Sequence, residues 1–132
     1  MLDDGQVVDT ILFAVANQLD GLGALASAEA MLIVQSGLNF FVPSGSGQAA
    51  LTMPLMSQLA DLVEVSRQTA VLAYQLGDGL TNLIVPTNPV LIGALALGGI
   101  PWTRWMRWVW PMMLVLMTAA VIAVAIAISI GY

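Results

Sequence analysis

Two stretches of the sequence repeat one pattern of residue types that suits ion binding. Both read Asn, two apolar residues, Val, Pro and then a hydroxyl residue, once from Asn39 to Ser44 and again from Asn82 to Thr87. A proline inside a helix leaves the carbonyl four residues earlier without its donor, and that residue is the asparagine in both copies. Each stretch thus offers a main-chain carbonyl, an amide and a hydroxyl, which makes these four polar residues the candidate ligands of a Na⁺ ion.

A new helix is expected to begin after each proline, near Ser46 to Gln48 in the first copy and at Pro89 in the second. Asn88 suits the N-cap position and Pro89 the first helical position. The free amides at a helix N-terminus favour negative charge, so both restarts suit a carboxylate. Secondary transporters place broken helices of this kind near the bilayer midplane, whereas a lone proline also occurs in ordinary transmembrane helices.

Asp78 is the ionisable residue that we single out. It lies between Gly77 and Gly79, one helical turn before Asn82, in an otherwise apolar stretch. A charged group inside a membrane segment is costly, and it then serves as an ion ligand, a proton carrier or a partner for a substrate amine. The alternative is a solvated or structurally paired carboxylate. Glu29 is a second candidate, for which an interfacial role is equally open.

The composition indicates a membrane protein. Hydrophobic residues make up 59% of the 132 residues and charged residues 8%, against about 25% charged in soluble domains. No charged residue occurs from Trp108 to Ile130, which as a helix would span about 35 Å. Because the hydrocarbon core of a bilayer is about 30 Å thick, this stretch is long enough to cross it.

The residues that are missing exclude several function classes. The sequence has no cysteine and no histidine, which removes disulfides, thiolate and imidazole metal sites, and histidine-assisted catalysis. An intramembrane aspartyl protease would need a second carboxylate facing Asp78, and no second aspartate is expected at membrane depth. With a net charge of −5, no basic patch is available for nucleic acid. We therefore expect neither an enzyme nor a nucleic-acid-binding protein.

Five segments must position these groups, and together they predict an all-α membrane protein. Short apolar runs joined by a Gly/Ser/Pro turn favour a re-entrant hairpin over an ordinary helical pair, and the two prolines of Pro86-Thr87-Asn88-Pro89 break the next helix. Arginine and tryptophan favour a cytoplasmic position for the loop before the last span. The expected segments are an interfacial amphipathic helix or the frayed end of a preceding helix (residues 1–20), the re-entrant hairpin (21–64), a discontinuous transmembrane helix (65–98), a cytoplasmic loop (99–107) and a full C-terminal transmembrane helix (108–132).

Three longer stretches resemble a known family of carriers. They are FFVPSGSGQAALTMPLMSQLADL (residues 40–62), SRQTAVLAYQLGDGLTNLIVPTNPVL (66–91) and GGIPWTRW (98–105). In these stretches the chain is similar to the C4-dicarboxylate anaerobic carrier family of the ion-transporter superfamily, in the branch described as "putative basic amino acid antiporters". It departs from the branch at Asn88-Pro89, where Ser-Gly is common.

The resemblance implies an architecture of two inverted repeats, each with a re-entrant hairpin and a broken helix, in a dimer of scaffold and transport domains. This chain would be the later part of the second repeat, so that the first repeat, with its half of the site, is missing. Carried over by position, the substrate and ion site would consist of Asn39, Ser44, Gly45, Ser46, Gly47 and Gln48 on one side and Asp78, Thr81, Asn82, Thr87 and Asn88 on the other.

The expected function is that of the C-terminal part of a secondary active transporter in the inner (plasma) membrane, multi-pass and homodimeric at full length. It would be a symporter or antiporter driven by Na⁺ or H⁺, for amino acids or C4-dicarboxylate-like organic anions. Surrounding lipid and the missing repeat would be its partners, with no bound cofactor. The alternative is a truncated or non-transporting membrane subunit.

Overall fold

The computed structural model describes residues 10, 13–14, 17–18, 21 and 23–132, and this part of the chain is helical without any strand. The amphipathic helix predicted for residues 1–20 falls mostly outside these described residues. From residue 23 onward the helices are α2 (Ala24–Leu38), α3 (Gly45–Leu62), α4 (Arg67–Thr81), α5 (Pro89–Leu97) and α6 (Trp102–Ile130). The prediction of an all-helical fold is confirmed for the residues described.

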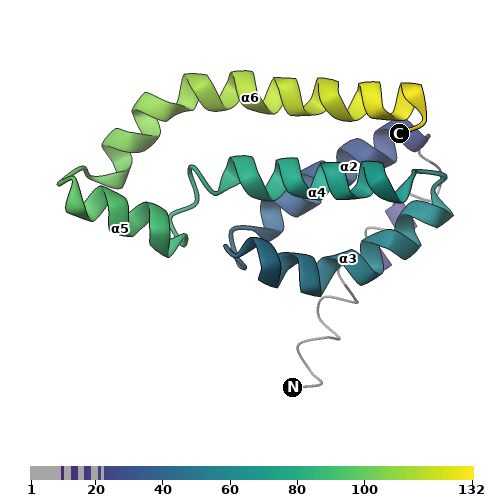
Figure 1. Ribbon diagram of the computed structural model, residues 1–132, viewed down its shortest axis with the longest axis horizontal. Helices are drawn as coiled ribbons and strands as arrows, with labels where there is room; N and C mark the ends of the chain where they lie inside the picture. Colours follow the sequence, from purple (N-terminus) through teal and green to yellow (C-terminus); the bar gives the residue numbers. More distant parts are fainter. Residues whose placement is uncertain (1–9, 11–12, 15–16, 19–20, 22) are drawn as a thin grey trace.

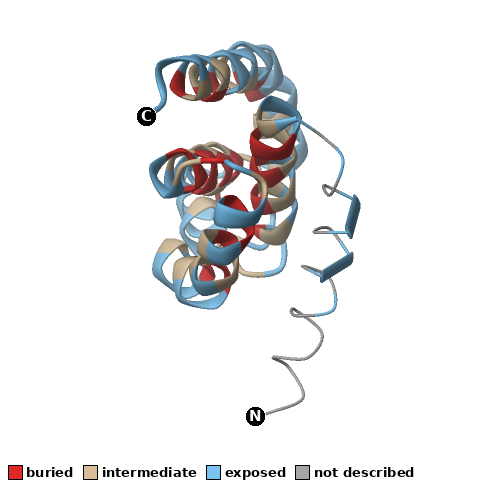
Figure 2. Cartoon of the chain, turned by 90° about the vertical axis from the view of Figure 1, so that its right-hand side faces the viewer, coloured by how far each residue is buried: buried red, intermediate tan, exposed pale blue. Residues whose placement is uncertain are grey.

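Helix α4 is the centre of the bundle. It packs against α2, α3 and α6, while α2 and α3 touch each other only slightly (Figure 1). The buried residues lie on the faces where these helices meet (Figure 2). Small side chains on α4, such as the fully buried Ala73, allow its neighbours to approach closely, as is common between helices in membranes. The core consists of Ala28, Met31, Leu32, Met56, Leu59, Ala60, Val65, Ala70, Ala73, Ala120 and Val124.

The helix that follows residue 66 is interrupted between Thr81 and Pro89. Two prolines three positions apart each remove a backbone donor, so a continuous helix cannot pass through them. Helix α5 then begins at Pro89 and ends at Leu97, and the Asn88 side chain caps it by accepting hydrogen bonds from the amides of Val90 and Leu91. The segment 82–88 between the two helices lies at one end of the bundle (Figure 1).

The predicted hairpin contains two helices joined by a short turn. Helix α2 ends at Leu38 with Asn39 as its C-cap, and α3 begins at Gly45 with Ser44 as its N-cap. The turn therefore comprises residues 39–44, close to the Gly/Ser/Pro stretch that predicted it. Whether this hairpin is re-entrant depends on its depth in a membrane, which remains a prediction.

The loop before the last helix is shorter than the predicted range of residues 99–107. Helix α6 already begins at Trp102, with Pro101 as its N-cap, so its first turns include both arginines of the predicted loop. Arg, Trp and Met all tolerate helical backbone, and Pro101 presets the entry into the helix. Helix α6 has 29 residues and is long and apolar enough to cross a membrane. It bends near its beginning (Figure 1), and it contains Pro111, which removes a backbone donor.

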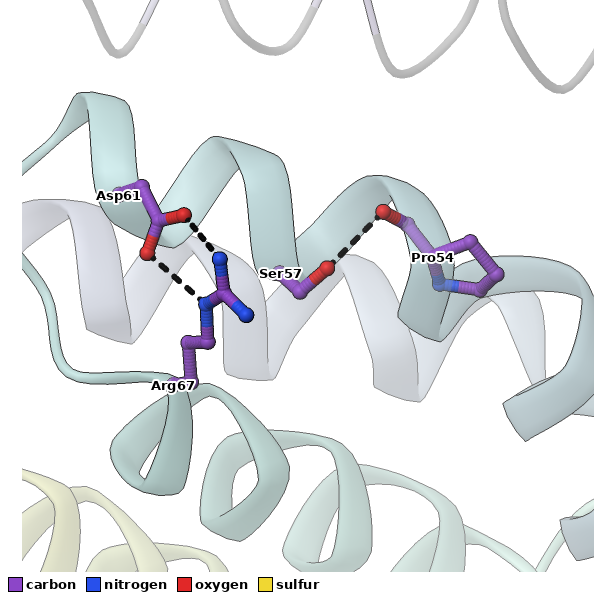
Figure 3. A network of polar contacts seen from close by, with 4 residues as sticks. All are labelled: Pro54, Ser57, Asp61 and Arg67. Atoms are coloured by element: carbon purple, nitrogen blue, oxygen red, sulfur yellow. Dashed lines mark hydrogen bonds and ion pairs between the residues drawn. The ribbon is translucent and has the colours of Figure 1, made fainter.

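An exposed ion pair lies at the opposite end of the hairpin, where α3 passes into α4. The Arg67 guanidinium donates to both carboxylate oxygens of Asp61, from Nε to Oδ1 at 3.0 Å and from Nη2 to Oδ2 at 2.6 Å (Figure 3). These hydrogen bonds hold the pKa of Asp61 below its ordinary value. One turn earlier, Ser57 Oγ donates to the Pro54 carbonyl at 3.0 Å. Because the pair is exposed to solvent, it contributes little to stability.

Gly77 offers a direct test of the close approach between α2 and α4. A Cβ added to Gly77 would lie 3.0 Å from the Leu32 carbonyl oxygen and from the Ser36 amide nitrogen, both backbone atoms of α2. Gly77→Ala must therefore push the helices apart, and we expect a loss of about 1–3 kcal/mol in the free energy of unfolding. Thermal unfolding of the purified full-length protein in detergent measures it.

Gly79→Ala is the matched control, two positions away on the same helix. A Cβ at Gly79 meets nothing within 4 Å, so alanine should leave stability unchanged or raise it by up to about 1 kcal/mol. Equal melting temperatures for the two variants would contradict the packing of α2 on α4.

Candidate functional site

The two helix breaks singled out by the sequence lie against each other. Thr87 Oγ1, in the break between α4 and α5, donates to the Phe40 carbonyl in the hairpin turn at 2.7 Å. Asn39 Nδ2, at the end of α2, donates to Thr81 Oγ1 at the end of α4 at 2.8 Å. Residues some forty positions apart in the sequence therefore share one polar cluster, at the end of the bundle where both breaks lie (Figure 1).

The main-chain carbonyl of Asp78 is the point at which the two breaks meet. It accepts hydrogen bonds from Asn39 Nδ2 at 3.0 Å and from Asn82 Nδ2 at 2.9 Å, in addition to the Asn82 main-chain amide at 3.1 Å. Helix α4 ends three residues later, so this carbonyl belongs to the last turn, where it keeps its helical donor, the Asn82 amide. The two asparagines of the repeated pattern thus converge on one atom.

Two buried side-chain oxygens at the hairpin turn have no donor in the described part of the chain. They are Asn39 Oδ1 and Gln48 Oε1, and both residues are fully buried. An amide oxygen can only accept a hydrogen bond or coordinate a cation, and a buried one without a partner is unfavourable. Glu29 Oε1 is also buried without a donor in the described part of the chain. It lies ten residues before Asn39, about 15 Å along α2, and is therefore not part of the hairpin turn.

Among the described residues no main-chain amide donates to the carbonyls of Asn39 and Asn82, as expected from the prolines four positions later. The helix ends differ from the expectation, because α2 and α4 stop at Leu38 and Thr81 and do not continue to the prolines. The main-chain amides of residues 42 and 85 then bond to the carbonyls of residues 38 and 81. The carbonyls released in the second break are those of residues 82–84, and each accepts from a side chain: Asn82 from Asn88 Nδ2 at 3.3 Å, Leu83 from Trp105 Nε1 at 2.9 Å and Ile84 from Trp102 Nε1 at 3.0 Å.

The Asp78 carboxylate faces the start of α3. Its Oδ1 accepts from Asn82 Nδ2 at 3.1 Å, and a Cβ added to Gly45 would lie 3.1 Å from its Oδ2. The Tyr74 hydroxyl, one helical turn before Asp78, donates to the Gly45 carbonyl. The absence of a side chain at Gly45 therefore lets the first turn of α3 rest directly on Asp78 and Tyr74.

Some of the predicted site residues contact one another in the polar cluster at the two breaks, and others do not. Asn82 Oδ1 accepts from Asn88 Nδ2 at 2.9 Å, which joins the start of α5 to the cluster. Asn39, Gly45, Asp78, Thr81, Asn82, Thr87 and Asn88 all contact this cluster. Ser44, Ser46 and Gly47 lie exposed at the turn, where Ser44 Oγ accepts from the Gly47 amide at 3.4 Å.

Gln48 is buried but belongs to a neighbouring network between α2 and α3. Its Nε2 donates to Gln35 Oε1 at 2.7 Å and to the Gln35 carbonyl at 2.9 Å. Gln35 Nε2 in turn donates to Thr52 Oγ1 at 3.1 Å. All three residues are almost completely inaccessible to solvent. The network links the two arms of the hairpin next to the turn that carries the site.

Several of these polar residues were not anticipated from the sequence. Spacing could have found three of them, because Gln35 precedes Asn39, Thr52 follows Gln48 and Tyr74 precedes Asp78 by four positions, one helical turn. Trp102 and Trp105 carried no such signal, since tryptophan near a loop is typical of a membrane interface. Their hydrogen bonds to the break depend on how α6 folds back.

Asn39 and Asn82 form a matched pair for testing the shared carbonyl. Asn39→Ala removes a buried donor to both the Asp78 carbonyl and Thr81, and we expect a loss of about 1–3 kcal/mol in stability. Asn82→Ala removes a donor to the Asp78 carbonyl and carboxylate and an acceptor of Asn88, but these groups are only partly buried, so water can replace the lost bonds and a loss of at most about 1 kcal/mol is expected. Thermal unfolding in detergent compares the two, and a larger loss for Asn82→Ala would contradict the assignment.

Comparisons with known proteins place the chain in a family. Residues 1–129 match the family described as "DcuC: C4-dicarboxylate anaerobic carrier". The Escherichia coli (strain K12) protein named "Putative basic amino acid antiporter YfcC" is 47% identical over 104 residues, which cover 79% of this chain and 21% of that protein. A Haemophilus influenzae (strain KW20 / Rd) protein named "Uncharacterized protein" is 35% identical over 130 residues, covering 98% of this chain and 25% of that protein.

This chain spans about a quarter or less of the length of these curated relatives. No solved structure matches it. The family match covers nearly the whole sequence, including both helix breaks and the apolar helix α6. The family consists of membrane transporters. The chain belongs to the C4-dicarboxylate anaerobic carrier family.

Proposed function

We propose that this chain forms the C-terminal part of a secondary active transporter, an ion-coupled symporter or antiporter whose substrate and coupling ion bind where the two helix breaks meet. The observation that carries the proposal is the convergence of Asn39 and Asn82 on the Asp78 carbonyl. Broken helices that meet in the membrane interior are how secondary transporters build such sites. As the resemblance implies, the full-length protein would be a multi-pass homodimer in the inner membrane, with the first repeat completing the site.

The hairpin turn and the second break supply different oxygens for a coupling cation. Among the four candidate Na⁺ ligands, Asn39 Oδ1 is buried and has no donor in the described part of the chain, so it is the one best suited to coordinate Na⁺. Ser44 contributes an exposed hydroxyl, and Thr87 Oγ1 keeps lone pairs while it donates to Phe40. Asn82 Oδ1 already accepts from Asn88, so it would join a Na⁺ site only by giving up that bond. If the coupling ion is H⁺, the Asp78 carboxylate is the group that carries it.

The start of α3 is the place for an anionic group of the substrate. Ser44 caps one amide there, that of Gly47, at the long distance of 3.4 Å. At α5, by contrast, the Asn88 side chain already accepts from two amides. A substrate carboxylate at the first turn of α3 would therefore meet amides that lack strong partners within the chain.

Asp78 beside the same turn favours an amino acid over a dicarboxylate. The α-carboxylate of an amino acid could take the α3 amides while its amine faces Asp78, since Gly45 brings the two together. A dicarboxylate would instead bring a second negative charge close to Asp78. Two like charges that lie close together repel each other strongly where water is excluded. Both substrate classes remain in the proposal, and binding experiments separate them.

Asp78→Asn in the full-length protein tests the role of the carboxylate. Asparagine keeps an oxygen that can accept from Asn82, and the main-chain carbonyl is unchanged, so the fold should persist. Loss of the charge should lower coupled uptake into proteoliposomes at least about tenfold, because a charged hydrogen bond contributes about 1.5–3 kcal/mol. Glu64→Gln, at an exposed acid in the loop between α3 and α4, is the control and should leave uptake unchanged. Normal coupled uptake by Asp78→Asn would remove the role assigned to Asp78.

Thermal shifts of the wild-type full-length protein identify the substrate class and the coupling ion. We expect stabilisation by amino acids rather than dicarboxylates, stronger with Na⁺ present if Na⁺ is the coupling ion. The alternative of a non-transporting subunit predicts no shift with any of these ligands. A shift with dicarboxylates alone would refute the substrate argument while leaving the transport proposal intact.

A further inference from the structure

The amino end of α6 carries two unpaired positive charges. Arg104 and Arg107 are exposed, and among the residues that the structure describes neither side chain takes part in an ion pair or hydrogen bond, whereas the Arg67 side chain is paired with Asp61. They lie three positions apart on one helix, so their side chains are neighbours. In a chain with a net charge of −5, this is a local concentration of positive charge.

A hollow in the surface adjoins Arg107. It has a volume of about 350 Å³ and is lined by Trp102, Thr103, Met106, Arg107 and Trp110. The lining combines one cation and one hydroxyl with aromatic and aliphatic walls. Tryptophan side chains prefer the level of the lipid headgroups, and arginine suits phosphate because its planar guanidinium can donate two parallel hydrogen bonds.

A second hollow continues along the same helix in its apolar part. It has a volume of about 410 Å³ and is lined by Leu114, Val115, Thr118, Ala119 and Ile122. The Thr118 hydroxyl donates to the Leu114 carbonyl at 2.7 Å, so this surface presents little unpaired polarity. Leu114 and Thr118 follow Arg107 by seven and eleven positions, which places them on its side of the helix. Part of this apolar hollow therefore lies on the side of α6 that carries Arg107, further toward the C-terminal end of the helix.

We propose that α6 binds an anionic phospholipid, with its phosphate at Arg104 and Arg107, its headgroup between the tryptophans and an acyl chain along the second hollow. Charge complementarity selects this occupant, since another protein segment would have to bring its own acids to two free arginines. Anionic lipids on the cytoplasmic leaflet are attracted by basic residues placed next to a transmembrane helix. The proposal requires α6 to lie in a membrane, but it does not require the transport mechanism.

The lipid would also touch the second helix break. Trp102 lines the headgroup hollow, and its indole Nε1 donates to the Ile84 carbonyl at 3.0 Å. A headgroup packed against Trp102 restricts the same side chain that satisfies the break. The bound lipid would thereby help to hold the segment between α4 and α5.

Native mass spectrometry of the detergent-solubilised full-length protein tests the proposal. The probes are dioleoyl phosphatidylglycerol, which is anionic, and dioleoyl phosphatidylcholine, which has no net charge. We expect the wild type to bind phosphatidylglycerol more tightly. The double variant Arg104→Gln/Arg107→Gln should lose roughly 25-fold in affinity for it, about fivefold for each arginine, with phosphatidylcholine binding unchanged.

Three controls separate the site from general charge effects. Arg67→Gln removes the remaining arginine and should leave the lipid preference intact, and Arg104→Lys/Arg107→Lys keeps the charges and should retain most of it. Inorganic phosphate should not displace the lipid. Equal binding of the two lipids, an unchanged preference in the glutamine double variant, an equal loss in Arg67→Gln or complete displacement by phosphate would each overturn the proposal.

Discussion

A main-chain carbonyl or amide without a partner is very costly in apolar surroundings, and this chain interrupts its helices twice. The last turn of α4 meets this constraint with more than its helical bond, because the Asp78 carbonyl accepts from the Asn82 main-chain amide and also from the side chains of Asn39 and Asn82. One carbonyl thereby holds the hairpin turn to the broken helix. The released carbonyls of the second break are satisfied by the nearby Asn88 and by the tryptophans of α6, which lie about twenty positions away in the sequence.

The remaining architecture allows these breaks to approach. Gly77 brings the backbones of α2 and α4 together, and Gly45 lets the first turn of α3 rest on Asp78 and Tyr74. With α4 as the common neighbour of α2, α3 and α6, a movement of the hairpin must rearrange contacts at α4. A site built on such a shared helix can couple the binding of an ion to the position of a hairpin, which is what alternating access requires.

The sequence predicted the helix ends well where residue types act locally. Asn88-Pro89 marked the start of α5, because capping and proline chemistry depend on near neighbours. The start of α3 was expected near Ser46 to Gln48 and lies slightly earlier, at Gly45, with Ser44 as the N-cap. The sequence misplaced the start of α6, since Trp102–Arg107 reads equally well as loop or helix. It could not place the indoles of Trp102 and Trp105 on the break, because that contact depends on how α6 packs. The depth of the hairpin in a membrane also does not follow from local sequence patterns.

The juxtaposition of the two breaks is the central claim, and thiol cross-linking tests it most directly. The chain has no cysteine, so Phe40→Cys/Thr87→Cys would introduce the only pair within it, at residues joined by the 2.7 Å hydrogen bond from Thr87 to the Phe40 carbonyl. A short bifunctional thiol reagent should link this pair in the folded full-length protein in membranes. It should not link Ser57→Cys/Thr87→Cys, because Ser57 lies about 18 Å along α3 from the turn. Failure of the first pair to cross-link, with both thiols shown to be reactive, would contradict the account.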